Sequence, residues 1–276
     1  MERLSDQGGS EQVDHTRLRI SQWAAYGLAG ERPDDLSTRR RWYGAADGGD
    51  VAAEALPAAL RRRVTELGQR AFRAACSLDI PEATRFIFCS RNGEFERTLS
   101  ILRALAGDDP VSPADFSLSV HNALAGLLSI AWRNKGGHTT IAAGADTFEA
   151  GLIEAASCLM NRPCEPVLVV YYDDCLPEPY DEIASVNESC VVLAMLLTSP
   201  QDDSVGVILE LTREASEGSG EELAGAPYAA HSGQSTFRSA TDAASALIEL
   251  LVNDAAEGRT HGSRFSHWRW CRAQAS

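Results

Sequence analysis

Two cysteines in the middle of the chain have the side chains best suited to covalent chemistry. Cys175 follows the acidic pair Asp173-Asp174 in a predicted loop, and Cys164 lies between Pro163 and Glu165. A cysteine beside a histidine can hydrolyse a thioester, because the imidazole takes the thiol proton and the thiolate attacks the carbonyl carbon. His121 or His138 would have to act as that base, yet nothing in the spacing pairs either with Cys175. The neighbouring carboxylates would also raise the pKa of the thiol, which weakens the case for such a hydrolase.

A cluster of acidic residues surrounds Cys175. Its members are Asp173, Asp174, Glu178, Asp181 and Glu182. Carboxylate oxygens can bind a divalent cation, but this spacing fits no known metal-binding loop. Two prolines interrupt the cluster, so we interpret it as a solvated surface turn and predict no metal and no cofactor.

The seven cysteines indicate a reducing compartment. Their number is odd, no two are arranged as Cys-x-x-Cys, and most lie in apolar segments, which excludes a zinc knuckle or a thioredoxin-like site. No apolar run reaches the roughly 18 residues that a membrane span needs. Residues 1–14 lack the basic and then apolar pattern of a signal peptide. We therefore expect a cytoplasmic protein without a membrane span.

The net charge of −14 argues against a nucleic-acid partner. A local basic run departs from this balance, and its members are Arg61, Arg62, Arg63, Arg70 and Arg73. We interpret the run as the solvated face of a helix.

The hydrophobic pattern predicts alternating strands and helices. Expected strands are 18–26, 83–89, 139–143 and 166–172, followed by a β-hairpin of strands 190–199 and 205–213. Expected helices are 57–75, 95–106, a single helix from 113 to about 128, 146–160 and 239–253. Residues 1–16 are predicted to be a disordered leader and residues 17–276 one domain, with irregular structure at 27–56 and a mobile loop at 214–234. This order is typical of an α/β fold with a layered, mixed sheet.

The most specific pattern lies between Ser112 and Ala156. It begins with Ser112-Pro113 and the element Asn122-Ala123-Leu124-Ala125-Gly126, then has a glycine loop at Gly136, the strand Thr140-Ile141, and the turn Ala142-Ala143-Gly144-Ala145 before a helix. This ungapped run resembles the middle of a β-ketoacyl synthase, and in particular the small ketosynthase-like proteins of aryl polyene and related type II polyketide pathways. The resemblance implies the N-terminal half of the layered thiolase-like fold.

The chain departs from that family at the position of the nucleophile. The ungapped alignment places the reactive cysteine of the family at Ala145, or at Gly144 if the register slips by one, and neither side chain can attack a thioester. The family's two catalytic histidines belong to a second half that has no counterpart in this sequence, where His231, His261 and His267 lie in polar segments. The resemblance thus implies a subunit that does not itself condense acyl chains.

The resemblance also implies a partner. Ketosynthases pair through the strand before the nucleophile and the helix before that strand, so the chain is expected to form a heterodimer with a full-length catalytic ketosynthase. Acyl carrier protein would be reached indirectly, because a chain this acidic is a poor dock for an acidic carrier. The implied interface or tunnel residues are Phe116, Leu118, His121, Asn122, Ala123, Gly126, Thr140, Ile141 and Ala143.

Three alternatives remain open. Phe116, Leu118 and His121 are the candidates for lining the partner's acyl tunnel, as in a chain length factor, or else they are plain core residues. The chain can instead be a pure scaffold that never touches substrate. The third alternative is the stand-alone thioester hydrolase built on Cys175.

Overall fold

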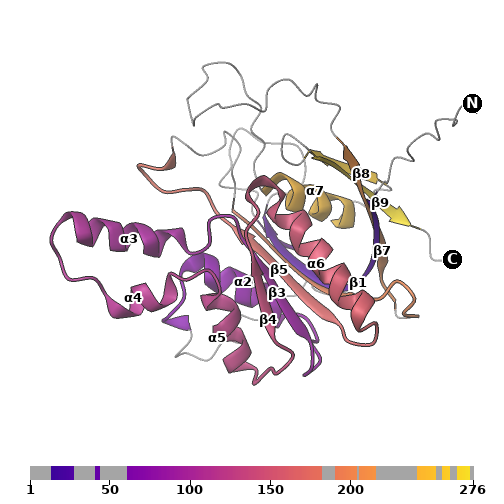
Figure 1. Ribbon diagram of the computed structural model, residues 1–276, viewed down its shortest axis with the longest axis horizontal. Helices are drawn as coiled ribbons and strands as arrows, with labels where there is room; N and C mark the ends of the chain where they lie inside the picture. The colour runs from indigo at the N-terminus through magenta and orange to yellow at the C-terminus, as the bar shows by residue number, and fades with distance from the viewer. Residues whose placement is uncertain are drawn as a thin grey trace, which may run out of the picture.

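The computed structural model describes residues 14–27, 41–43, 61–181, 190–203, 205–215, 241–252, 257–261 and 266–273. These residues form one mixed sheet of nine strands with helices on both faces (Figure 1). The strands are β1 (Asp14–Gly27), β2 (Arg41–Tyr43), β3 (Arg85–Cys89), β4 (His138–Ile141), β5 (Val167–Asp173), β6 (Val191–Thr198), β7 (Val207–Ala215), β8 (Glu257–His261) and β9 (Ser266–Ala273). The α/β class predicted from the sequence is confirmed.

The sheet has the order β4-β3-β5-β6-β1-β7-β9-β8, and β2 pairs with the end of β1. Only the pairs β3–β4 and β3–β5 are parallel among the described strands. The predicted hairpin of β6 and β7 is wrong, because β1 lies between these strands and pairs antiparallel with both. Sequence adjacency suggested direct pairing, but the long β1 offers both of its edges to strands made much later in the chain.

Strands β5 and β6 form the buried centre of the sheet. Residues Val167–Asp173 are all buried, and so are all residues of β6 except Thr198. Their apolar runs do not alternate with polar residues because helices cover both faces. One apolar core packs beneath α6 and α7 and includes Ile87, Val169 and Leu193, and the other packs beneath α2 and α5 and includes Phe86, Phe88 and Val170.

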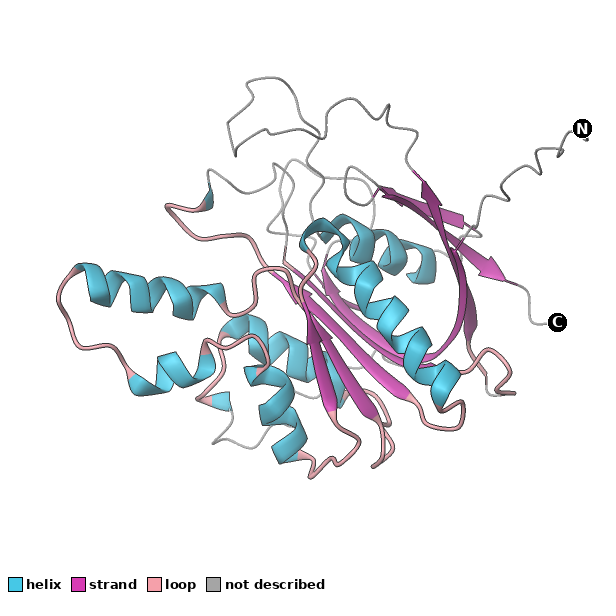
Figure 2. Cartoon of the chain, viewed as in Figure 1, coloured by secondary structure: helices cyan, strands magenta, loops and turns pink. Residues whose placement is uncertain are grey.

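The helices are α2 (Glu66–Cys76), α3 (Phe95–Ala106), α4 (Pro113–Leu118), α5 (Ala123–Ala131), α6 (Thr147–Asn161) and α7 (Thr241–Val252). Figure 2 shows α6 and α7 over one face of the sheet, while α3 and α4 extend away from it. The prediction of a single helix from 113 to about 128 is wrong, because the chain forms two helices there, α4 and α5, separated by residues 119–122. None of the described helices is long and apolar enough to cross a membrane.

Several predicted boundaries change in the structure. Residues 14–16, assigned to the leader, belong to β1, and residues 41–43 of the predicted irregular segment form β2. Residues 214–215 of the predicted mobile loop lie in β7. The rest of the leader and loop, 1–13 and 216–234, fall outside the described residues. The tail after α7 contains β8 and β9, which extend the sheet.

Candidate functional site

A sharp turn joins β4 to α6 at the place where the sequence predicts the nucleophile elbow. Gly144 has φ +61° and opens a short 3-10 turn at Gly144–Asp146 that leads into α6. No atom lies within 4 Å of where a Cβ would stand at Gly144, so glycine serves the backbone angle there and not a tight fit. The Thr147 hydroxyl accepts from the Ala143 amide at 2.9 Å and donates to the Gly144 carbonyl at 2.8 Å. The elbow is therefore well formed.

The elbow contains no side chain that can act as an acyl nucleophile. Ala143 and Gly144 are exposed and Ala145 is half-buried, so a methyl group occupies the position implied for the cysteine. The thiol of Cys89 lies beneath α6, where a Cβ added at Gly151 would stand 2.2 Å from its sulfur. Burial, reinforced by Asp173 and Glu154, raises the pKa of Cys89 far above the thiol range. A thiol that stays protonated and enclosed cannot take over the missing role.

β4 lies at one end of the sheet, and no described strand pairs with its outer side. The Phe86 amide donates to the Gly137 carbonyl at 3.0 Å and the Ser90 amide to the Ile141 carbonyl at 3.2 Å. Because main-chain groups alternate sides along a strand, the N–H and C=O groups of His138 and Thr140 face away from β3. The edge therefore offers a donor and an acceptor at Thr140 to another strand.

Exposed apolar side chains lie in the helical region that precedes β4 in the chain. They come from α3, from α4 and the residues just after it, and from α5, and they are Leu102, Leu105, Phe116, Val120 and Ile130. Phe116 is 66% exposed and Ile130 is 73% exposed, which is unusual for side chains of this size. Figure 1 places α3, α4 and α5 together on the side of the molecule where β4 ends the sheet. Such a grouping marks a surface suited to another protein.

The other predicted site residues occupy different environments. Leu118 is half-buried and packs against the core beneath α2 and α5, which favours the plain core role in this chain. Ile141 packs against the opposite core. Asn122 is exposed, and Ala123 and Gly126 are half-buried. Nothing lies within 4 Å of where a Cβ of Gly126 would stand, so no neighbour within the described chain requires glycine there.

His121 is anchored to the turn that follows β3. Its Nε2 lies 2.8 Å from the Ser90 carbonyl oxygen, and a Cβ added at Gly93, where φ is +61°, would stand 2.9 Å from its Nδ1. The break between α4 and α5 thus has a physical cause, because His121 holds the chain against this turn. This contact gives His121, one of the predicted site residues, a specific polar partner.

The buried carboxyl of Asp173 holds the same turn from below. It accepts hydrogen bonds from the Ser90 hydroxyl at 2.8 Å and from the amides of Arg91 and Asn92 at 2.9 and 3.1 Å. Burial raises the pKa of Asp173, and these hydrogen bonds work in the opposite direction. The carbonyl of Ser90 also contacts His121, which lies just before α5. Asp173 therefore indirectly fixes the start of that helix. An acid directly after an apolar strand is a signal that could have indicated this role, which we did not predict.

A second polar network joins α2, α3 and α4. Arg97 of α3 lies 3.2 Å from Glu94 Oε2 and 2.8 Å from Asp115 Oδ1, and it also donates to the Arg63 carbonyl. Glu94 in turn accepts from the hydroxyl of Thr65, the N-cap residue of α2, at 2.6 Å. We did not predict this network, although Arg97 stands one turn after Glu94.

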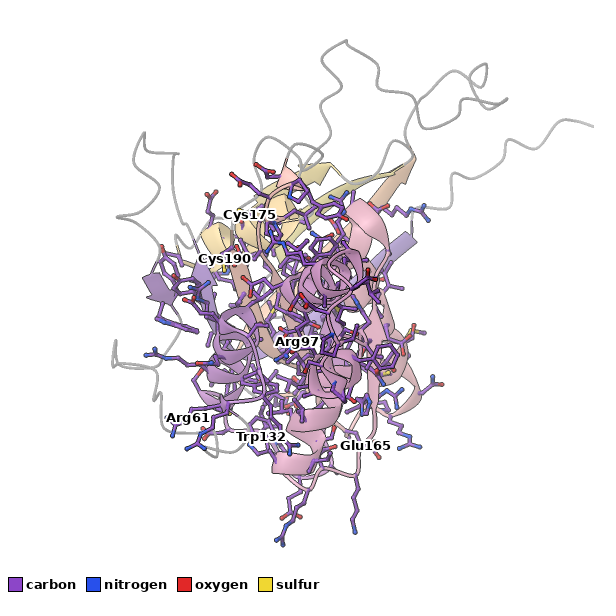
Figure 3. All side chains as sticks on the ribbon, turned by 90° about the vertical axis from the view of Figure 1, so that its left-hand side faces the viewer. Arg61, Arg97, Trp132, Glu165, Cys175 and Cys190 are labelled. Carbon is purple, nitrogen blue, oxygen red and sulfur yellow. The ribbon has the colours of Figure 1, made fainter. Side chains whose placement is uncertain are left out.

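The thioester hydrolase gains no support from the geometry. His138 begins β4, whereas Cys175 follows the end of β5, and both strands run parallel to β3, so they lie at opposite ends of the sheet. The imidazole of His121 contacts the Ser90 carbonyl oxygen. Cys190, labelled in Figure 3, lies just before β6, and its thiol is 3.1 Å from Arg70. Burial, followed by the charge of Asp174, raises the pKa of Cys190 to about 12.

The prediction of a solvated turn is wrong for Asp173, which is buried at the end of β5, and the acidic cluster is divided among separate structural roles. Asp173 binds the Ser90 turn, Asp174 lies 3.6 Å from Arg70, and the Glu178 carbonyl accepts from Arg103 of α3. No group of His, Cys, Asp or Glu suited to a metal ion occurs among the residues that the structure describes. Glu182 falls outside those residues.

The basic run divides at the start of α2. Arg61, Arg62 and Arg63 precede the helix and are exposed, as predicted for a solvated face. Arg70 and Arg73 instead stack on Tyr26 and Trp42, each with its guanidinium carbon 4.8 Å from the ring centre. These two arginines therefore help to attach α2 to β1 and β2.

Comparison with solved structures supports the fold. A chain of a ketosynthase (ApeO) in complex with its chain length factor (ApeC) from Xenorhabdus doucetiae is 20% identical with a TM-score of 0.67, over 92% of this chain and 99% of that chain. The ishigamide ketosynthase/chain length factor is 16% identical with a TM-score of 0.51, over 72% and 67%. A β-ketoacyl synthase from Burkholderia phymatum is 11% identical with a TM-score of 0.51, over 73% and 65%.

Among curated protein sequences, none is significantly similar to this chain. The family model described as the β-ketoacyl synthase N-terminal domain matches residues 37–271, which is most of the sequence. The layered mixed sheet, the elbow between β4 and α6, and this match lead to one conclusion: the chain belongs to the β-ketoacyl synthase N-terminal domain family.

Proposed function

We propose that this chain is a non-catalytic, chain-length-factor-like subunit that pairs with a complete β-ketoacyl synthase. The observation that carries the proposal is a well-formed elbow without a nucleophile, directly beside a strand whose outer edge pairs with no described strand. The partner would supply the cysteine and both histidines for condensing acyl chains held on an acyl carrier protein. This chain would supply the interface, in a pathway of the type II polyketide or fatty acid class, with aryl polyenes as the nearest model.

The structural comparison supports the proposal through length. The Xenorhabdus structure contains a ketosynthase with its chain length factor, and the alignment covers nearly all of both compared chains, so the two chains have similar lengths. The ishigamide and Burkholderia alignments cover 72% and 73% of this chain and 67% and 65% of the compared chains, so those chains are only slightly longer. A chain of this length paired with a ketosynthase is the arrangement that we propose here. The odd number of cysteines and the absence of a Cys-x-x-Cys pair fit action in the reducing cytoplasm.

The open edge supplies the interaction. A partner strand can pair with the outward N–H and C=O groups at Thr140 and continue the sheet into the second subunit. Exposed apolar side chains of α4 and α5, with Phe116 and Ile130 the most exposed, would become buried in the same contact. Together these features combine main-chain hydrogen bonds with an apolar surface, as stable protein interfaces do.

Co-expression with the complete ketosynthase encoded nearest to it tests the proposal. We expect a one-to-one complex by size-exclusion chromatography with light scattering. Thr140→Pro removes the outward amide without removing a bond to β3, and we expect it to abolish the complex. Thr140→Val keeps the amide and the branched shape, so it should behave like the wild type. A wild-type chain that is stable alone and forms no complex with the ketosynthase would refute the proposal.

Phe116 separates a tunnel-shaping subunit from a pure scaffold. Its exposure leaves the ring free to reach a partner, which favours tunnel shaping. We expect Phe116→Ala to change the length of the acyl product made by the intact complex. An unchanged product would favour the scaffold.

A further inference from the structure

α4 is a short helix with little apolar packing of its own to hold it in position. It has six residues, from Pro113 to Leu118, and none of them is buried. An isolated helix of this length is not stable in water. Its attachment to the rest of the molecule must therefore depend on particular contacts at its ends. Leu118 supplies one such contact at the C-terminal end, by packing against the core beneath α2 and α5.

Arg97 supplies the contact at the N-terminal end. Its side chain is only 12% exposed and lies near the middle of the face that α3 and α4 present (Figure 3). One nitrogen binds Glu94, a second binds Asp115 of α4 at 2.8 Å, and the third binds the Arg63 carbonyl before α2. A planar guanidinium carries its donors on three separate nitrogens and so reaches three widely spaced acceptors, whereas the donors of a lysine all lie on one nitrogen.

Glu94 makes this attachment rigid. Its side chain is 3% exposed, and it accepts hydrogen bonds from the hydroxyl and the amide of Thr65 as well as from Arg97. Charge-assisted hydrogen bonds between enclosed groups are stronger than exposed ion pairs, which water and salt screen. Arg97 is therefore fixed to the body of the protein before it reaches α4.

Asp115, the residue that Arg97 holds, stands directly before Phe116. The carboxylate is partly exposed and the phenyl ring next to it projects outward. The direction of the ring is set by the turn of helix that Arg97 holds at Asp115 and that Leu118 closes. A shift of α4 would move Phe116 with it and leave the sheet unchanged.

We propose that Arg97 is a positioning residue that sets where α4 presents Phe116 to the ketosynthase partner, and so controls product length without touching the acyl chain. This inference rests on the proposed function and extends it to a residue away from the open strand. The recognition takes place within the chain, because the guanidinium of Arg97 bridges the buried carboxylate of Glu94 and the partly exposed carboxylate of Asp115.

Hydrogen exchange of the chain alone tests the positioning. We expect Arg97→Lys and Asp115→Asn to speed amide exchange in residues 114–118 by roughly tenfold, with little change in β5 and β6. Arg103→Lys is the matched control, since it alters another arginine of α3 that binds only the Glu178 carbonyl among the interactions described. Unchanged exchange in α4 would overturn the inference.

Product analysis of the complex tests the consequence. With Arg97→Lys or Asp115→Asn we expect the one-to-one complex to persist and the share of products outside the main length to rise roughly twofold or more. Asp115→Asn leaves Glu94 and Thr65 undisturbed, so it remains informative if Arg97→Lys fails to fold. An intact variant complex with the wild-type product distribution would overturn the inference. A wild-type chain that forms no complex would refute the proposed function, and α4 exchange would then decide the positioning alone.

Discussion

The centre of the sheet and its β4 edge are built in opposite ways. β5 and β6 are buried on both faces, and even the acid that ends β5 is enclosed by hydrogen bonds. β4 is exposed or half-buried along its length, and neighbouring α4 has no buried residue. The chain therefore completes its own core at the centre of the sheet, whereas the outer side of β4 pairs with no described strand.

The strongest break in the centre should come from Asp173→Ala. Removing the carboxyl leaves the Ser90 hydroxyl and two amides without acceptors in a buried place, and we expect a loss of about 3 kcal/mol of unfolding free energy. Urea denaturation measures it. Asp174→Ala, which alters the half-exposed neighbour, should cost less than about 1 kcal/mol. Equal losses for the two variants would contradict the central role of Asp173.

A smaller break should come from Gly151→Ala, where α6 presses on β3. The added Cβ would stand 2.2 Å from the Cys89 sulfur, so the helix or the strand has to move, at about 2 kcal/mol. Cys89→Ala in the same chain removes the obstructing sulfur. Thermal or urea unfolding of the single and double variants should therefore show partial recovery, and strict additivity would refute the contact.

The edge should respond to substitution only when the partner is present. We expect Ile130→Ser to leave the stability of the isolated chain within about 0.5 kcal/mol and to weaken the complex by about 1–2 kcal/mol. Val205→Ser is the matched control, because Val205 is equally apolar and exposed but lies between β6 and β7. Calorimetric titration with the ketosynthase separates them. A similar loss of affinity for both variants would show that the edge is not special.

The smallest effect should be a dependence of stability on pH from Asp173. Burial gives this carboxyl a higher pKa in the folded chain than in the unfolded chain. Its stabilising contribution is therefore complete below the ordinary carboxyl pKa and is lost as pH rises through the raised value. Wild type should lose stability relative to Asp173→Asn as pH rises from the ordinary carboxyl pKa through the raised value, and then level off. Urea curves at a series of pH values that stay parallel would contradict this.

The parts predicted correctly from sequence depend on local patterns. The bounds of α3 match the amphipathic period at 95–106, and β3, β5 and β6 follow from apolar runs of strand length. The elbow between β4 and α6 also lies where the resemblance placed it.

The errors come from contacts between distant residues. The insertion of β1 between β6 and β7 depends on pairs such as Arg19 with Thr198, which no local pattern indicates. The break between α4 and α5 depends on His121 meeting the Ser90 carbonyl. Arg97 escaped prediction for the same reason, because Asp115 and Arg63 approach it only in the folded chain.

The place of β1 has a consequence for how the protein is made in the cell. β1 is synthesised well before β6 and β7, the strands that flank most of its length, so apart from the end that meets β2 its two edges stay unpaired while the ribosome continues. At ordinary translation rates that wait is on the order of ten seconds. During that time the unpaired main-chain groups of β1 can pair with other chains, and a chaperone can shield them. Slow assembly through such distant pairings is expected once synthesis ends.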